Sequence, residues 1–240
     1  MKVPVIVVLK RFKPGKLLTV FFTVFFCLFL TLGFWQLNRA HEKSILAEQV
    51  NSSASQFEAS TNPSPYQSFK IAGQFTELPT FYMDNRTLNG QAGYEVWLFF
   101  ETKQGRWLVS SGWVAGLNTR EKMPSFELST KPQAIEIIVR PDSENPMYGV
   151  DTNTPLNDGK SVWLVQSLNQ QWIENLYPKK PLLGLAQLKD SELFGVGPSV
   201  WQPSVMTVEK HLGYSLQWFG MSIALLGMFL YAGFSRKQQQ

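Results

Sequence analysis

The sequence predicts a membrane hairpin, in which two transmembrane α-helices bracket a mostly antiparallel β extramembrane domain (α+β, small barrel or sandwich). Residues 17–38 and 211–234 are apolar and contain no Asp, Glu, Lys or Arg. At about 1.5 Å rise per residue, each of them is long enough to cross the ~30 Å hydrocarbon layer. Between them, short runs of aromatic and β-branched residues are separated by turn-forming residues, which predicts strands.

The charges at the two ends of the chain predict how it is oriented. Lys10, Arg11 and Lys16 precede the first span, and Arg236 and Lys237 follow the second, and basic residues stay on the cytoplasmic side. The expected organisation is a cytoplasmic N-terminal tail over 1–16, transmembrane helix 1 over 17–38, a periplasmic domain over 39–210, transmembrane helix 2 over 211–234, and a cytoplasmic C-terminal tail over 235–240.

The first span is expected to be an uncleaved anchor. Its apolar run exceeds the usual core of a signal peptide, which is about 7–15 residues, and no small-x-small cleavage site follows it directly. The N-terminus lacks a long Arg- and Ser-rich transit peptide, which favours a bacterial inner (plasma) membrane protein over a mitochondrial one.

The central domain contains several predicted elements. The first helix is expected to continue past Arg39, because Ile45, Leu46 and Val50 recur at helical spacing. After a linker, the expected elements are strands over 69–75 and 80–83, a loop or hairpin turn over 84–93 that contains Asn89-Gly90, and a hairpin of 94–101 and 106–114. Strands over 134–140 and 161–168, separated by a long loop over 141–159, are followed by a short helix over 170–177 and an irregular stretch over 178–203 with one further strand.

Composition excludes several classes of site. The single cysteine, Cys27, lies in the first span, so the outer domain has no disulfide, CxxC pair or c-type haem attachment site. With only two histidines in the chain, a multi-histidine metal site and a nucleophile–His pair in the domain are not expected. We therefore expect no enzyme, although paired carboxylates need no fixed spacing and stay open. The basic tails act as topology signals, so no nucleic-acid partner is expected.

One face of the second span carries the most informative side chains. His211, Tyr214, Ser215, Trp218 and Ser222 recur at helical spacing and share that face. A neutral imidazole at the membrane surface can ligate haem iron, and aromatic rings can lie against the macrocycle. The alternative is an interfacial belt, because Trp and Tyr gather at membrane surfaces without a ligand.

Two further candidates are weaker. His41 lies just beyond the outer end of the first span and would be a second axial ligand, or a solvated residue on a charged helix end. Trp35 and Arg39, four residues apart, are spaced for a cation–π contact. In the domain, Arg86 of Asp84-Asn85-Arg86 would clamp a carboxylate, or Asp84 would cap a turn beside a solvated arginine.

Four blocks of residues carry a resemblance to a known family. They are Leu32–Gln36 with Arg39 and Lys43; Asn85-Arg86 with Gly90 and Gly93–Val96; Trp107–Val114; and Glu209–Phe219. In content and order they resemble the Surfeit-one family of cytochrome c oxidase assembly proteins, over nearly the whole chain. Ser110-Ser111 departs from an Asn-Arg pair often found before Gly-Trp in that family, so no functional arginine is carried onto those positions.

The resemblance implies assembly of an oxidase and no catalytic turnover. The chain would be a membrane chaperone that holds haem a transiently, with His211 on the iron and Tyr214, Trp218 and His41 as further cofactor-binding residues. Its implied partners are subunit I of cytochrome c oxidase, other oxidase assembly factors, a haem a synthase and membrane lipid. The alternative is a haem-free scaffold that docks subunit I through the second helix, using Gly213, Ser215, Gly220 and Ala224 for close approach.

Overall fold

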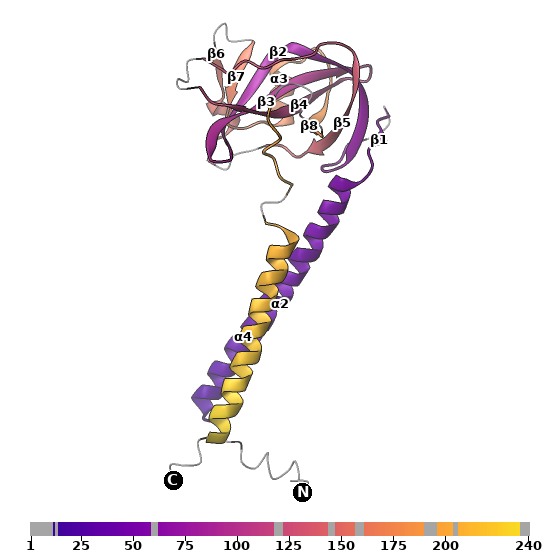
Figure 1. Cartoon of the computed structure of the whole chain (residues 1–240). Coiled ribbons are helices and arrows are strands. Elements are labelled where there is room, and N and C mark those ends of the chain that lie inside the picture. Colours follow the sequence, from indigo (N-terminus) through magenta and orange to yellow (C-terminus); the bar gives the residue numbers. More distant parts are fainter. Residues whose placement is uncertain are drawn as a thin grey trace. The chain divides into compact units, whose positions relative to one another are not determined.

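The computed structural model describes residues 12, 14–58, 62–117, 122–143, 147–156, 161–189, 196–203 and 206–235. The chain divides into a helical unit, Met1–Leu46 with Ser204–Gln240, and a β unit, Ala47–Pro203. Figure 1 shows the labelled helices and strands of both units.

The helical unit consists of two long helices that expose their large apolar side chains. Helix α2 spans Lys16–Asn51 and helix α4 spans Val208–Ser235, and both are long and apolar enough to cross a membrane. The buried residues are mostly small or polar: Gly33, Gln36 and Ala40 in α2, and His211, Ser215, Ser222 and Gly233 in α4. This distribution suits lipid as the solvent, since small residues let two helices approach closely while apolar side chains face hydrocarbon.

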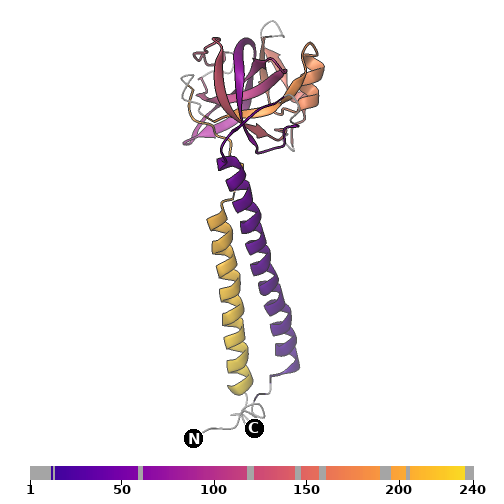
Figure 2. The same cartoon turned by 90° about the vertical axis from the view of Figure 1, so that its right-hand side faces the viewer.

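The two helices run antiparallel, side by side, in both views of the molecule (Figures 1 and 2). Ring contacts define their register: Phe22 stacks on Phe229 with a centroid distance of 4.1 Å, and Phe29 lies 5.7 Å from Trp218. Residue numbers fall on α4 as they rise on α2, which is the antiparallel order. The expected continuation of the first helix is confirmed, because α2 runs through to Asn51.

The β unit contains a closed barrel, which decides between the two predicted architectures. The described strands are β1 (Ser55–Gln56), β2 (Ser68–Leu88), β3 (Gln91–Thr102), β4 (Arg106–Ala115), β5 (Gln133–Arg140), β6 (Thr154–Leu156), β7 (Val162–Val165) and β8 (Leu182–Leu188). Pairing runs from β3 through β4, β8 and β5 to β2, and β2 pairs with β3 again, which closes the circuit. Strand pairs are mostly antiparallel, although β4 pairs with β8, and β2 with β1 and β7, in parallel.

One long strand replaces two predicted strands and most of a predicted loop. Strand β2 continues to Leu88, so a loop over 84–93 is wrong, and the alternative, a hairpin turn at Asn89-Gly90, is confirmed, with φ of 50° and 81° at these residues. The strand absorbs its turn-forming residues through register shifts, one of them between Met83 and Arg86, where Asn85 adopts a φ of 57°. Asparagine tolerates this left-handed conformation better than most residues.

Several other predicted elements are confirmed. The hairpin of β3 and β4, the strand β5 and the short helix α3 (Gln170–Leu176) are confirmed, and β8 is the further strand expected in 178–203. Asn169 caps α3, its side chain accepting from Trp172 N–H. The predicted long loop over 141–159 contains a short 3₁₀ helix, η1 (Val150–Thr152), and the strand β6.

Two apolar clusters alternate across the barrel strands. The first draws buried residues from all five barrel strands, including Phe100 and Trp107, and fills the barrel interior. The second lies on the outer face, where Phe81 and Trp97 are covered by Ile173 of α3. Alternation of side chains along each strand sends successive residues to the two cores, so the hairpin β3–β4 is buried on both faces.

Candidate functional site

The histidine predicted to bind a ligand lies in the contact between the two long helices. His211 is in the first turn of α4 and is 7% exposed. Its Nδ1 atom lies 2.7 Å from Oε1 of Gln36 on α2, which is also buried. An amide oxygen only accepts hydrogen bonds, so Nδ1–H donates in this contact, and in a neutral imidazole Nε2 then carries the lone pair. Among the described residues, no protein group bonds Nε2.

A second polar contact lies one turn further along the same face. Ser215 Oγ–H donates to the carbonyl oxygen of Gly33 at 3.0 Å, and Ser215 is fully buried. Gly33 is required here for steric reasons, because an added Cβ would lie 2.7 Å from the ring of Phe219. The two hydrogen bonds and the ring therefore join the end of the first span to the start of the second.

The predicted face of α4 packs against the chain's own first helix. His211, Ser215 and Ser222 are buried in the helical unit, and Trp218 is half-buried against Phe29. Tyr214 lies at the edge of this face and is 45% exposed. Sequence spacing thus identified the buried face of α4, and in the structure helix α2 packs against it.

His41 is placed away from this contact. It follows Gln36 by five residues, which is about 140° around the helix, and its side chain is exposed. Nearby, Arg39 lies 5.8 Å from the centroid of the Trp35 ring, as the spacing predicted, and forms an exposed ion pair with Glu42 at 2.7 Å. The structure therefore brings His211 to Gln36 and leaves His41 on the other side of α2.

A single imidazole limits which metals this site suits. Among the described residues, no group of three or more His, Cys, Asp and Glu side chains could hold a metal ion. An isolated Nε2 lone pair fits a metal that already carries its other ligands, and the iron of a haem is such a metal. The Nδ1–H bond to a carbonyl oxygen is the usual support for a metal-binding imidazole.

The β unit contains a buried ion pair that sequence reasoning missed. Arg140 on β5 donates to Glu95 Oε1 on β3, and Ser110 Oγ–H donates to the same oxygen at 2.7 Å. The guanidinium lies over two rings, 4.5 Å from the centroid of Trp97 and 4.8 Å from that of Trp201. Burial lowers the pKa of Arg140, while the charge of Glu95 opposes that effect. Glu95, Ser110 and Arg140 are on three different strands, β3, β4 and β5, so no local motif indicates the pair.

Arg86, the predicted carboxylate clamp, faces this internal carboxylate. Its Nε lies 3.7 Å from Glu95 Oε2, and the side chain is about a third exposed. The preceding Asp84 accepts from the backbone N–H of Asn85 at 2.8 Å and from Gln166 Nε2–H at 3.0 Å. The arginine is therefore neither a simple solvated loop residue nor a free clamp.

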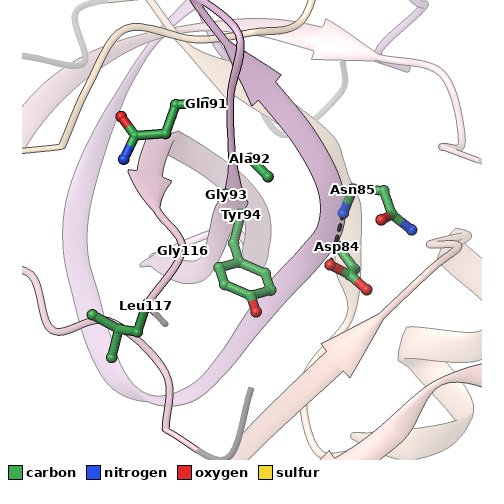
Figure 3. A pocket seen from close by; sticks show the side chains of 8 residues that line it. All are labelled: Asp84, Asn85, Gln91, Ala92, Gly93, Tyr94, Gly116 and Leu117. Carbon is green, nitrogen blue, oxygen red and sulfur yellow. Dashed lines mark hydrogen bonds between the residues drawn. The ribbon is translucent and has the colours of Figure 1, made fainter. Parts of the chain in front are cut away.

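A hollow of about 250 Å³ lies beside this segment (Figure 3). Its lining consists of Asp84, Asn85, Gln91, Ala92, Gly93, Tyr94, Gly116 and Leu117. Gly93 is required because an added Cβ would lie 2.2 Å from the Val114 carbonyl oxygen and 2.6 Å from the Trp113 ring. The Trp113 Nε1–H in turn donates to the carbonyl oxygen of Arg86 at 2.9 Å. The second and third blocks of the family resemblance thus meet in one folded unit, and the hollow lacks a histidine or cysteine.

Comparison with known proteins identifies the family. A model of the SURF1 family matches residues 23–223. The chain is 27% identical to a SURF1-like protein of Rickettsia conorii over 220 residues, covering 85% of this chain and 86% of the relative. It is 28% identical to one of Rickettsia felis over 217 residues (85% and 92%), and 27% identical to one of Rickettsia bellii over 227 residues (88% and 88%). The chain belongs to the SURF1 family, as its four blocks predicted.

Proposed function

We propose that this SURF1-family chain is a membrane-anchored assembly factor for haem–copper cytochrome c oxidase, which holds haem a and assists its insertion into subunit I. Membership of the family implies a role in the assembly of cytochrome c oxidase. The observation that supports haem as the cargo is the state of His211, whose Nδ1–H is engaged by Gln36 while Nε2 keeps its lone pair.

The residues present fit a transient haem site. His211 would be the iron ligand through Nε2, and the neighbouring rings of Tyr214 and Trp218 offer surface for the macrocycle. When bound, haem a supplies the iron centre that the oxidase uses for its redox chemistry. Because His211 is 7% exposed, its imidazole can be reached only at the edge of the helix pair, or after α2 and α4 separate. A single, largely covered ligand suits a carrier that has to release its cargo.

We also propose that the chain sits in a bacterial inner membrane with both termini cytoplasmic and the β unit periplasmic. Two helices that can cross a membrane and the basic residues outside them support this topology. The partners we expect are subunit I, other oxidase assembly factors and a haem a synthase. No enzymatic turnover is proposed, because both histidines belong to the helical unit, and the barrel therefore lacks the commonest general base.

An absorption spectrum tests the haem proposal. The full-length protein is purified in detergent after co-expression with haem a synthesis enzymes, beside His211→Ala and the control His41→Ala. A haem spectrum in the parent and in His41→Ala that is lost or shifted in His211→Ala supports the proposal. The absence of haem from all three folded proteins would refute it.

A haem-free scaffold is the second candidate, and the open face of α4 favours it. An added Cβ at Gly213 or Gly220 would meet nothing within 4 Å, and Ala224 is also exposed. Ser215 does not belong to this surface, since it is bonded to Gly33. A scaffold predicts that Gly220→Leu reduces crosslinking to subunit I, while Ile223→Leu, at a 72% exposed apolar position, leaves it unchanged. Equal crosslinking of both variants would count against docking at this face.

A further inference from the structure

We propose that Gln36 is a positioning residue that fixes the tautomer of His211, so that the first transmembrane helix sets the ligand strength of a histidine on the second. The hydrogen bond between the Gln36 and His211 side chains lies within the helical unit. Its use in binding haem rests on the proposed function.

Burying Gln36 in an apolar span is energetically unfavourable unless its side-chain amide is hydrogen-bonded. It lies in the charge-free span of α2, is 9% exposed, and is surrounded in sequence by Phe34, Trp35 and Leu37. A side-chain amide without a hydrogen-bond partner in an apolar environment is strongly unfavourable. The 2.7 Å contact with His211 Nδ1 removes that cost. Polar residues in such spans generally mark a functional contact.

The neighbouring turn makes this contact specific. Gly33 precedes Gln36 by three residues, and Ser215 follows His211 by four, so the two hydrogen bonds lie on adjacent turns of antiparallel helices. Gly33 also lies against the ring of Phe219, where an added Cβ would be 2.7 Å from the ring. The register that joins Ser215 to Gly33 therefore also holds the Gln36 carbonyl opposite His211 Nδ1.

The chemical consequence follows from the direction of the bond. A carbonyl acceptor keeps the hydrogen on Nδ1, which leaves Nε2 as the only nitrogen able to ligate iron. The same bond raises the basicity of Nε2 and fixes the ring orientation. Replacing the acceptor frees the ring to exchange tautomers and to rotate. Loss of such a supporting partner typically lowers metal affinity about 10–100-fold.

Nitrogen NMR of the full-length protein tests the tautomer without haem. Only two histidines are present, so a sample labelled with [¹⁵N]histidine gives two imidazole patterns, and His41→Asn assigns them. We expect His211 in the Nδ1–H form in the parent, and a mixture or the Nε2–H form in Gln36→Leu. Gln36→Glu should restore the Nδ1–H form, because a carboxylate also accepts. The Nε2–H form in the folded parent would overturn the proposal.

Haem titration of the same variants separates this inference from the proposed function. We expect Gln36→Leu to weaken haem binding about 10–100-fold and Gln36→Glu to recover it. Thr31→Val is the matched control, since it removes a side-chain hydrogen bond of the same span that stays within α2, to the Cys27 carbonyl oxygen, and keeps Gln36. An equal loss in Thr31→Val and Gln36→Leu, with the tautomer unchanged, would overturn the positioning role. An Nδ1–H tautomer without haem binding in any variant would refute the proposed function and leave the tautomer assignment standing.

Discussion

The barrel and the helix pair bury opposite kinds of side chain. In the β unit, large aromatic residues such as Trp97 and Trp107 are buried, and so is a pair of full charges, Glu95 and Arg140. In the helix pair, small and neutral polar residues are inside, and large apolar residues are outside. The difference reflects two solvents. Water drives apolar side chains into the protein interior, whereas lipid is itself apolar and provides no hydrophobic driving force for burying them.

This contrast separates a supporting unit from a reactive one. The buried charges of Glu95 and Arg140 pair with each other and join β3 to β5. In the helix pair, one imidazole nitrogen of His211 is engaged by Gln36, and no protein group among the described residues bonds the other. We therefore propose that the helix pair carries the ligand chemistry and that the barrel has a mechanical role.

The largest effect is expected from breaking the charge pair in the barrel. Arg140→Ala removes the nearest cation from the buried Glu95, which keeps the Ser110 hydroxyl and the more distant Arg86, and should lower the free energy of unfolding by about 3–5 kcal/mol. Urea unfolding of the detergent-solubilised chain, followed by tryptophan fluorescence, measures it. Lys70→Ala is the control, because its ion pair with Glu136 is exposed and should contribute at most about 1 kcal/mol. Similar losses in both variants would show that burial of the pair is unimportant.

A steric change in the helix pair should have a smaller effect. Gly33→Leu drives a side chain into the ring of Phe219 and should destabilise the pair by roughly 1–3 kcal/mol. Gly213→Leu is the matched control in α4, since its Cβ position is open. Unfolding of both variants in an SDS titration, read by far-UV circular dichroism, gives the difference. If Gly213→Leu is the more damaging variant, the contact between α2 and α4 is not the one described.

Alkaline pH should weaken the barrel through one tyrosine. Tyr82 O–H donates to the Pro124 carbonyl oxygen at 2.8 Å, and burial raises the pKa of Tyr82 to about 12 from an ordinary value of 10.0. A pKa raised by folding means that the stability is complete below pH 10 and is lost as the pH rises through 12. The loss should be on the order of 1 kcal/mol at pH 11. Tyr82→Phe should lack this part of the pH dependence between pH 9 and 11.5, and an unchanged slope in the variant would contradict the assignment.

The smallest effect is expected from the hydrogen bond between Ser215 and Gly33. Ser215→Ala should cost about 0.6 kcal/mol, the average for interhelical hydrogen bonds in membranes. The same SDS titration measures it, with Ser44→Ala as the control, because Ser44 bonds only within its own helix. A loss above about 2 kcal/mol would mean that this bond, and not the steric contact at Gly33, holds the helices together.

Local sequence patterns predicted most of the helices and strands, but they could not predict which residues far apart in the chain pair with each other. The hairpin of β3 and β4 was predicted because alternation and turn residues are local signals. The length of β2 was missed because Asp84 and Asn85 are turn-forming residues, and only pairing with β3 and β7 keeps them in a strand. Closure of the barrel depends on the parallel pairing of β4 with β8, which no local pattern specifies.

The candidate site shows the same division. Helical spacing placed His211 and Ser215 on one face, and the structure buries both. Helical spacing could not identify the residues that contact them, since Gln36 lies 175 residues from His211 in the chain. One signal was present in the sequence, namely a glutamine inside an apolar span one turn before the membrane surface. The partners of Glu95 had no comparable signal, because an acidic residue in a strand ordinarily faces water.

The most direct test of the central claim is the haem a content of the oxidase in a strain that lacks this gene. The strain is complemented with the wild-type chain, His211→Ala or His41→Ala, at matched membrane levels, and the reduced-minus-oxidised spectrum of the membranes is recorded. We expect the wild type and His41→Ala to restore the haem a signal and His211→Ala to leave it strongly reduced. Full restoration by His211→Ala would contradict the assignment of chemistry to the helix pair.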